Sequence, residues 1–313
     1  MMATSIETSV RSMRLYQDAG AESMSPKVKA SSSFVLPDSS VLHYSLEGNL
    51  APDSPVLLFV NDIYVNLQVW DPAIALLKES CPQYRFLRYD LRGYSVESIG
   101  DSEAITMSLL VSDLEYLFNR LSIAHIHSIV GLGFGANIAL ELLAKRRPIA
   151  STFVGIGFAI SDSALTRRQQ VVDDWPLRSS LARRFGMGIL ADKAVARWFT
   201  PDARRSAQWI RVREMIAAGS TEGMEKLSNA VIECAGHGTE QRGQRTLENL
   251  EVPALFLCGS SDESIPEEME TYPALMEKEK GLFILLDRTS RLACCEKPGE
   301  FVRLLGNWLH RFS

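Results

Sequence analysis

The sequence of 313 residues lacks any apolar run that approaches the ~18 residues of a membrane-spanning helix, so no membrane insertion is expected. It also lacks a positive charge excess. The net charge is −5, whereas nucleic-acid binding would need a basic face. The single basic cluster, residues 166–184, has helical spacing and is interrupted by Asp173 and Asp174, which favours a solvated helix face. We therefore expect neither a membrane nor a nucleic acid as a partner.

Cysteine is scarce, and its pattern argues against two kinds of site. The five cysteines are Cys81, Cys234, Cys258, Cys294 and Cys295. Their number is odd and no pair has the spacing of metal ligands, so we expect reduced thiols, a cytoplasmic location and no metal or other cofactor. Residues 1–32 lack the apolar core of a secretory signal and are interpreted as a flexible extension.

From residue 33 onward, strand-like and helix-like segments alternate. Apolar runs typical of strands lie at 33–37, 41–48, 55–61, 84–90, 125–131 and 151–157, and helical spacing at 68–80 and 106–122. Only helical patterns follow from about 161 to 248, and the alternation resumes at 252–259. This order predicts an α/β fold with a mainly parallel, doubly wound sheet (33–160 and 249–313) and a helical cap insertion (161–248) over a crevice.

The segment GLGFGANIAL (131–140) follows a strand-like run and begins a helix-like one, which is the context of the nucleophile elbow G-x-S-x-G. Gly131 and Gly135 stand at the two outer glycines, but the central residue is Gly133. Glycine provides no hydroxyl for nucleophilic attack. Because glycine tolerates a left-handed backbone without a Cβ clash, we predict a positive φ at Gly133 in a sharp turn.

Four other segments resemble landmarks of the α/β-hydrolases. They are FVNDIYVNLQVWDP (59–72), with Asn61 and Asp62 at the usual His-Gly pair, YDLRGYSVES (89–98), VPALFLCGSSDESIP (252–266), with Asp262 at the triad acid, and RTSRLACCEKPGEF (288–301), with Arg291 at the triad histidine. The resemblance covers residues 35 to 312 and implies an α/β-hydrolase fold with a helical cap. The cap segment RRFGMGILADKAVARWFTP (183–201) looks most like the 3-oxoadipate enol-lactonase branch.

The resemblance implies a substituted catalytic triad. Triad hydrolysis needs a hydroxyl, a base that takes its proton and an acid that orients the base. Gly133 stands at the nucleophile position, and Arg291 stays protonated at physiological pH and so cannot be a general base. Only Asp262 remains. We predict a structural ion pair between Asp262 and Arg291; the alternative is that Arg291 holds a carboxylate or enolate of a ligand.

Backbone and side-chain groups near the elbow are candidate ligand contacts. The N–H groups of Ile63 and Phe134 could form a residual oxyanion hole, with Gly133 widening the pocket floor. Asp62 either caps the start of a helix or, together with Tyr64, serves as an acid or base.

Two further regions have weaker signals. Asp173, Asp174 and Trp175 are interpreted mainly as a helix boundary at the start of the cap, with Trp175 kept as a candidate substrate contact. His237 is the one histidine with a path to the crevice, and Cys294 and Cys295 are expected to be buried and inert.

The leading hypothesis is a non-hydrolytic enzyme: a cofactor-free cyclase, isomerase or lyase of secondary metabolism that acts on a carbonyl-bearing small molecule under the cap. The first alternative is a pseudoenzyme that binds a small molecule or a protein partner. The second is an atypical hydrolase in which a base such as Asp62 activates water. The expected ligand is a small carbonyl compound, and homodimerisation stays open.

Overall fold

The computed structural model describes residues 30–101, 103–145, 148–160, 165–235 and 239–312. All but the last residues of the expected extension at 1–32 lie outside this part of the chain, and so does His237. Every helix in the described ranges is too short or too polar to cross a membrane.

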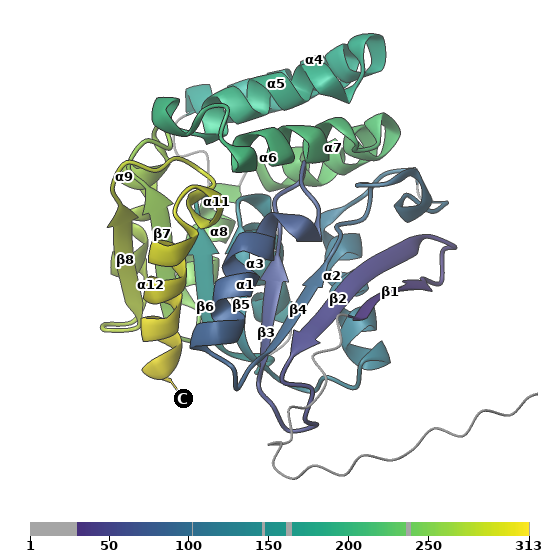
Figure 1. Cartoon of the computed structure of the whole chain (residues 1–313). Coiled ribbons are helices and arrows are strands. Elements are labelled where there is room, and N and C mark those ends of the chain that lie inside the picture. Colours follow the sequence, from purple (N-terminus) through teal and green to yellow (C-terminus); the bar gives the residue numbers. More distant parts are fainter. Residues whose placement is uncertain (1–29, 102, 146–147, 161–164, 236–238, 313) are drawn as a thin grey trace, which may run out of the picture.

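An eight-stranded sheet runs through the middle of the molecule (Figure 1). Its strands are β1 (Ala30–Val35), β2 (Val41–Gly48), β3 (Val56–Val60), β4 (Arg85–Tyr89), β5 (Ile126–Leu132), β6 (Ala150–Ile156), β7 (Ala254–Gly259) and β8 (Gly281–Leu286). They lie in the order β1-β2-β4-β3-β5-β6-β7-β8. The β1–β2 and β2–β4 pairs are antiparallel and all others are parallel, which confirms the predicted α/β fold with a mainly parallel sheet.

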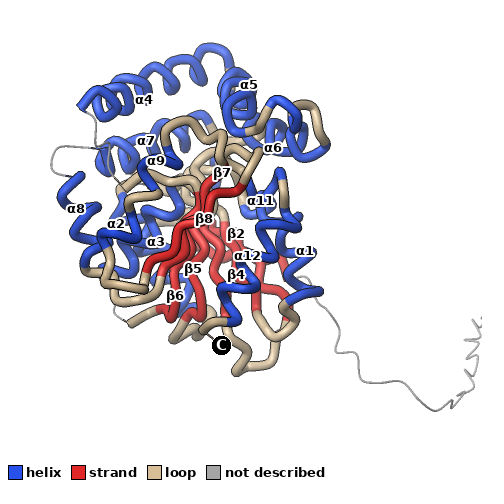
Figure 2. The backbone as a smooth tube through the Cα atoms, turned by 90° about the vertical axis from the view of Figure 1, so that its left-hand side faces the viewer, coloured by secondary structure: helices blue, strands red, loops and turns tan. Residues whose placement is uncertain are grey.

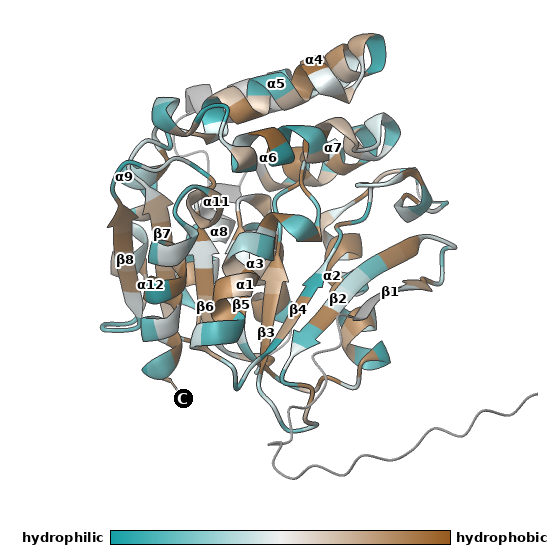
Figure 3. Cartoon of the chain, viewed as in Figure 1, coloured by the Kyte–Doolittle hydropathy of each residue, from teal (hydrophilic) through white to brown (hydrophobic). Residues whose placement is uncertain are grey.

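Helices cover both faces of the sheet (Figure 2). One face carries α1 (Asp71–Ser80), α11 (Ala293–Glu296) and α12 (Pro298–His310); the other carries α2 (Met107–Arg120), α3 (Phe134–Lys145) and α8 (Thr239–Glu248). The central strands are therefore apolar on both sides, and all five residues of β3 are buried (Figure 3). Short helices α9 (Ile265–Met269), α10 (Tyr272–Leu275), η1 (Leu67–Trp70), η2 (Val96–Ser98) and η3 (Pro201–Ala203) lie in the connections.

Four helices lie across the end of the sheet at which the parallel strands terminate (Figure 1). They are α4 (Leu165–Phe185), α5 (Met187–Trp198), α6 (Ala207–Ala217) and α7 (Thr221–Ala235). The helix boundary expected at residues 173–175 is wrong, because α4 continues through Pro176. Packing of α4 against α5 and α7 accounts for the continuous helix, since tertiary contacts can outweigh a local helix breaker. Loops from several strands converge beneath these helices.

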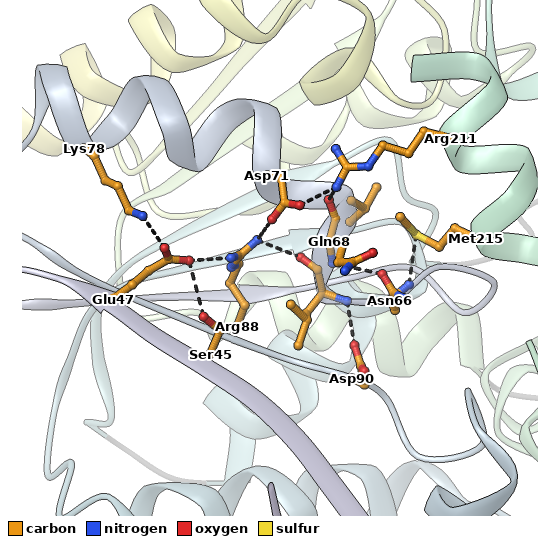
Figure 4. Close-up of polar contacts among 12 residues, drawn as sticks. Ser45, Glu47, Asn66, Gln68, Asp71, Lys78, Arg88, Asp90, Arg211 and Met215 are labelled. Atoms are coloured by element: carbon orange, nitrogen blue, oxygen red, sulfur yellow. Dashed lines mark hydrogen bonds and ion pairs between the residues drawn. The ribbon is translucent and has the colours of Figure 1, made fainter. Parts of the chain in front are cut away.

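A buried charge network joins the sheet to α1 and to α6 (Figure 4). Arg88 of β4 is 1% exposed and donates to Glu47 of β2 and to Asp71 Oδ1 of α1, the latter at 2.5 Å. Asp71 also accepts from Arg211 of α6, and Glu47 accepts from Lys78 of α1. Buried charges are costly unless they are paired, so the network holds α1 and α6 in place relative to the sheet.

Asp90 makes a second link between the sheet and α6 (Figure 4). It follows β4 and accepts a hydrogen bond of 2.6 Å from the N–H of Leu67. The neighbouring Asn66 donates through its N–H to Met215 Sδ of α6 at 3.3 Å and through its side chain to the Tyr94 hydroxyl at 3.1 Å. Burial raises the pKa of Asp90 to about 6, and the Leu67 N–H opposes this shift only in part.

We expect Arg88→Met to lower the free energy of unfolding by about 3–5 kcal/mol, because the substitution leaves Glu47 buried with one cation fewer. The matched control is Arg211→Gln, which removes an ion pair to Asp71 that is about one-third exposed on both sides and should cost about 0–1 kcal/mol. Urea unfolding followed by tryptophan fluorescence measures both. Equal losses in the two variants would contradict the structural role of Arg88.

The raised pKa of Asp90 predicts a pH dependence of stability. The folded protein keeps the proton on Asp90 up to about pH 6, whereas the unfolded chain releases it near the ordinary value of 3.8. The resulting stabilisation is fully present below the pKa of Asp90 in the unfolded chain and is lost as pH rises through its pKa in the folded protein. The free energy of unfolding should fall by an amount on the order of 3 kcal/mol over this range. Asp90→Asn should remove this component. Urea unfolding of both proteins between about pH 4 and pH 7 measures it, and parallel pH profiles would contradict the assignment.

Candidate functional site

The turn between β5 and α3 has the sharp geometry expected of the glycine-framed segment. Gly133 has φ +53°, which confirms the predicted left-handed backbone. Its N–H donates to Ile156 O at 2.8 Å, and its carbonyl accepts from Ala136 N–H at 3.1 Å, the first turn of α3. The turn thus presents residue 133 toward the cap without offering a side chain that can react.

The carboxylate of Asp62 occupies the space that a side chain at residue 133 would need. A Cβ built on Gly133 would lie 2.8 Å from Asp62 Oδ1 and closer still to Oδ2 and Cγ. Asp62 follows β3, the strand that pairs with β5, so the two loops meet at the end of the sheet. Glycine at position 133 is therefore required by Asp62 as well as by the backbone conformation.

Both N–H groups expected to form an open oxyanion hole are already bonded to Asp62. Asp62 Oδ1 accepts from Ile63 N–H at 2.9 Å and from Phe134 N–H at 3.0 Å. The prediction that these two N–H groups face a ligand oxygen is therefore wrong, because the Asp62 carboxylate already accepts a hydrogen bond from each of them. Asp62 does act at a helix start, but that of α3, since Asn66 caps η1.

Arg291 lies between two aspartates. Its Nη1 is 3.6 Å from Asp62 Oδ2 and its Nε is 3.7 Å from Asp262 Oδ2. The predicted ion pair between Asp262 and Arg291 is thus confirmed, at a distance longer than a hydrogen bond, and Asp62 is an additional partner. Burial alone would lower the pKa of Arg291, but Asp262 and Asp62 outweigh it and raise the pKa. Burial raises the pKa of Asp262, against the effects of Arg291 and Arg197.

Three buried atoms of this group have no hydrogen-bond partner among the described residues: Asp62 Oδ2, Asp262 Oδ2 and Arg291 Nε. Buried polar atoms are almost always paired in folded proteins. Unpaired atoms beside a cavity are free to bond a ligand or water, and two of the three residues, Asp62 and Arg291, line a cavity.

A cavity of about 330 Å³, here called the floor cavity, lies between the elbow and the cap. Asp62, Ile63, Gly133, Phe134 and Arg291 line it from the sheet side, and Trp175, Arg178 and Arg197 line it from α4 and α5. Its volume lies within the range of small-molecule sites. Several of the sequence-predicted residues are thus gathered around one space.

Tyr64, the expected partner of Asp62 in acid–base chemistry, does not line the floor cavity. Its ring stacks on Trp175 at 5.7 Å and contacts Trp198 at 5.9 Å, below α4 and α5. The hydroxyl is buried without a hydrogen-bond partner of normal geometry. Burial raises its pKa, with the nearby Arg178 opposing the shift. A neutral, buried phenol packed among tryptophans is poorly suited to exchange a proton with a ligand above Asp62.

The arginines of the cap were missed by sequence reasoning. Arg178 belongs to the basic cluster at 166–184, which was expected to be a solvated helix face. Arg183 and Arg184 of this cluster are indeed exposed, but Arg178 turns toward the floor cavity. Arg197 precedes Trp198 at the end of α5 and had no distinguishing pattern. The sequence did contain one indication: Arg178 follows Trp175 by three residues, so the two side chains share one face of a helix. In the structure the guanidinium lies 5.1 Å from the Trp175 ring.

The cysteines differ in their position relative to this site, because Cys234 lines the floor cavity and is partly exposed. Cys258, Cys294 and Cys295 are buried, and burial raises the pKa of the Cys258 thiol. Within the ranges that the structure describes, no group of three or more His, Cys, Asp or Glu side chains is placed to hold a metal ion.

Comparison with known proteins identifies the family to which the fold belongs. A family model described as alpha/beta hydrolase fold matches residues 55–284. The chain is 27% identical over 232 residues to 3-oxoadipate enol-lactonase 2 of Acinetobacter baylyi, which covers 71% of the chain and 76% of that protein. These matches confirm the predicted superfamily and the resemblance to its enol-lactonase branch.

Solved structures agree on the fold. The enol-lactonase from Burkholderia xenovorans has a TM-score of 0.71 and 23% identity, with 87% of the chain and 97% of that protein covered. A thermophilic esterase from Thermogutta terrifontis has a TM-score of 0.75 and 21% identity, with 92% and 99% covered.

The packing of Asp62 against the elbow can be measured by a double-mutant cycle. We expect Gly133→Ala to destabilise the protein by about 2–3 kcal/mol, of which about 1 kcal/mol comes from the positive φ and the rest from displacing Asp62. In an Asp62→Gly background only the backbone component should remain. Chemical unfolding of the four proteins gives the coupling.

Gly186→Ala is the matched control, because Gly186 has φ +80° and a Cβ there meets no atom within 4 Å. It should cost about 1 kcal/mol whether or not Asp62 is present. An identical cost of Gly133→Ala in both backgrounds would show that Asp62 does not fill the elbow.

Proposed function

The chain belongs to the alpha/beta hydrolase fold family, and within it we propose that it is a non-hydrolytic member that binds a small molecule in the floor cavity. The observation that carries this proposal is the Asp62 carboxylate. It takes the volume of a nucleophile side chain at Gly133 and both N–H donors that would stabilise an oxyanion.

Charge supports the same conclusion. In ester hydrolysis by this fold, negative charge develops on the former carbonyl oxygen, and the fold stabilises it with N–H groups. An ionised Asp62 in that place would repel this charge at close range. Arg291, at the position of the base, cannot accept a proton from an attacking hydroxyl or water. Ligand binding needs neither a free oxyanion hole nor a general base, whereas ester hydrolysis needs both.

The lining of the floor cavity suggests what such a ligand carries. Asp62 Oδ2 is buried next to the cavity, and its ion pair with Arg291 leaves it without a hydrogen bond, so a hydroxyl, amine or other donor of the ligand would satisfy it. Arg178, Arg197 and Arg291 place three guanidinium groups around the same space, which favours carboxylate or carbonyl oxygen atoms elsewhere in the ligand. We propose a small molecule with both kinds of group.

The unpartnered Oδ2 of Asp62 also favours a second candidate function, a proton-transferring isomerase or lyase. The carboxylate would remove a proton next to a ligand carbonyl, and the enolate that results would be stabilised by Arg291 rather than by backbone N–H groups. This candidate function is the isomerase or lyase hypothesis drawn from the sequence, with Arg291 in place of the backbone N–H groups as the group that stabilises the enolate.

The rival function is hydrolysis, since the relatives named above are enol-lactonases and an esterase. In this chain hydrolysis would need water activated by Asp62, without a covalent intermediate. Wild-type turnover of p-nitrophenyl acetate that disappears in Asp62→Asn would support the rival. Incorporation of solvent deuterium into 4-oxopentanoate by the wild type, but not by Asp62→Asn, would instead support proton transfer.

Restoring the missing groups tests the proposal directly. We expect Asp62→Gly/Gly133→Ser/Arg291→His to hydrolyse p-nitrophenyl acetate, because the triple variant has a hydroxyl, a base next to Asp262 and two free N–H donors. Gly133→Ser/Arg291→His without the change at Asp62 should be roughly 100-fold slower, since the displaced Asp62 carboxylate still competes with the ester oxygen for the two N–H donors. Steady-state ester turnover measures both.

The control is the triple variant with Asp262→Asn, which should lose the gained activity. Wild-type protein that turns over the ester as fast as the triple variant would contradict the proposal.

A further inference from the structure

A second cavity, here called the gallery, opens between α4 and α5. It has a volume of about 270 Å³ and an apolar wall made by Tyr64, Leu177, Leu181, Leu190, Ala194 and Trp198. The exposed Lys193 also lines the gallery. The apolar wall would accept the hydrocarbon portion of a ligand.

The gallery and the floor cavity meet at three shared residues. Asp174, Arg178 and Arg197 line both spaces. The first two lie on α4 and the third on α5, so these two helices form the junction together. A ligand that extends from one space into the other must pass these charged side chains.

The two arginines at the junction have weak partners among the described residues. Arg178 is 3.6 Å from Asp174, and Arg197 is 3.6 Å from Glu263, both beyond hydrogen-bond distance. Each acid is more than half exposed, so these pairs contribute little. Burial lowers the pKa of Arg197, and the charges of Arg291 and Arg178 act in the same direction, against Glu263 and Asp262. An anionic ligand between Arg178 and Arg197 would give both guanidinium groups a closer partner than their present ones.

We propose that the two cavities together bind an amphipathic carboxylic acid whose carboxylate lies between Arg178 and Arg197, with a hydrocarbon chain that extends into the gallery and a polar substituent next to the carboxylate that extends toward Asp62. This inference rests on the proposed ligand-binding function and specifies the class of ligand. Two guanidinium groups can hold one carboxylate from both sides. The tail then lies among Leu177, Leu181 and Leu190.

The gallery also sets an approximate length for the tail. At roughly 30 Å³ per heavy atom of liquid-like packing, a volume of about 270 Å³ accommodates on the order of nine non-hydrogen atoms. A four-carbon acid would leave most of the gallery unfilled, and each CH₂ group that is not buried loses apolar contact. Octanoate is therefore a suitable probe of the gallery and of the arginines at the junction.

Isothermal titration of the wild-type protein with octanoate, butanoate and 1-octanol tests the proposal. We expect octanoate to bind at least ~10-fold more tightly than either of the others, because butanoate lacks the tail and 1-octanol lacks the charge. Equal affinity for octanoate and butanoate would overturn the assignment of the gallery, and equal affinity for octanoate and 1-octanol would overturn the assignment of the arginines.

Variants separate the two parts of the site. Arg197→Gln should weaken octanoate at least ~10-fold and leave 1-octanol unchanged, whereas Arg184→Gln, on the exposed side of α4, should change neither. Leu181→Trp should fill the gallery and remove the preference for octanoate over butanoate. Ile210→Trp, an exposed position on α6, is its control, and Leu181→Phe is the milder replacement if Leu181→Trp lowers the melting temperature.

Different results would overturn the two-cavity site and the proposed non-hydrolytic function. Octanoate binding that is insensitive to Leu181→Trp and to Arg197→Gln would overturn the two-cavity site while leaving a ligand in the floor cavity. Rapid ester hydrolysis by the wild type would overturn the proposed function whatever the pattern of octanoate binding.

Discussion

The hydrogen bonds from two backbone N–H groups to Asp62 are the interaction on which the rest of the site depends. They place a carboxylate directly against the elbow, at Oδ1 distances of 2.9 and 3.0 Å from Ile63 N and Phe134 N. Gly133 must stay without a side chain because Asp62 is there, and Arg291 lies close because a buried carboxylate needs a cation. One residue in the loop after β3 thus contacts the elbow, both N–H groups and Arg291.

The fold supplies the remaining elements. Parallel strands bring the loops that carry Asp62, Gly133 and Asp262 to one edge of the sheet, where α4 and α5 close over them (Figure 1). The network around Arg88 anchors α6 and the loop after β3 to that edge. Such rigid support holds the geometry of the crevice, which encloses the floor cavity.

Most of the fold could be predicted from the sequence, and the site only in part. Alternating apolar runs and the three glycines of GLGFGANIAL indicated the sheet and the elbow, because strand periodicity and positive φ are local properties. The direction of the Asp62 carboxylate depends on packing between two loops far apart in sequence, so its contact with Phe134 N–H was not foreseen. Which face of α4 is buried depends in the same way on α5 and α7, and Arg178 was therefore misread as solvated.

The most direct test of the central claim is a high-resolution crystal structure of the ligand-free protein, with attention to the two amide groups at the elbow. We expect Asp62 Oδ1 within hydrogen-bond distance of both Ile63 N and Phe134 N, and a positive φ at Gly133. A water molecule or other oxygen between the two N–H groups, with Asp62 turned away from them, would contradict the account and restore an open oxyanion hole.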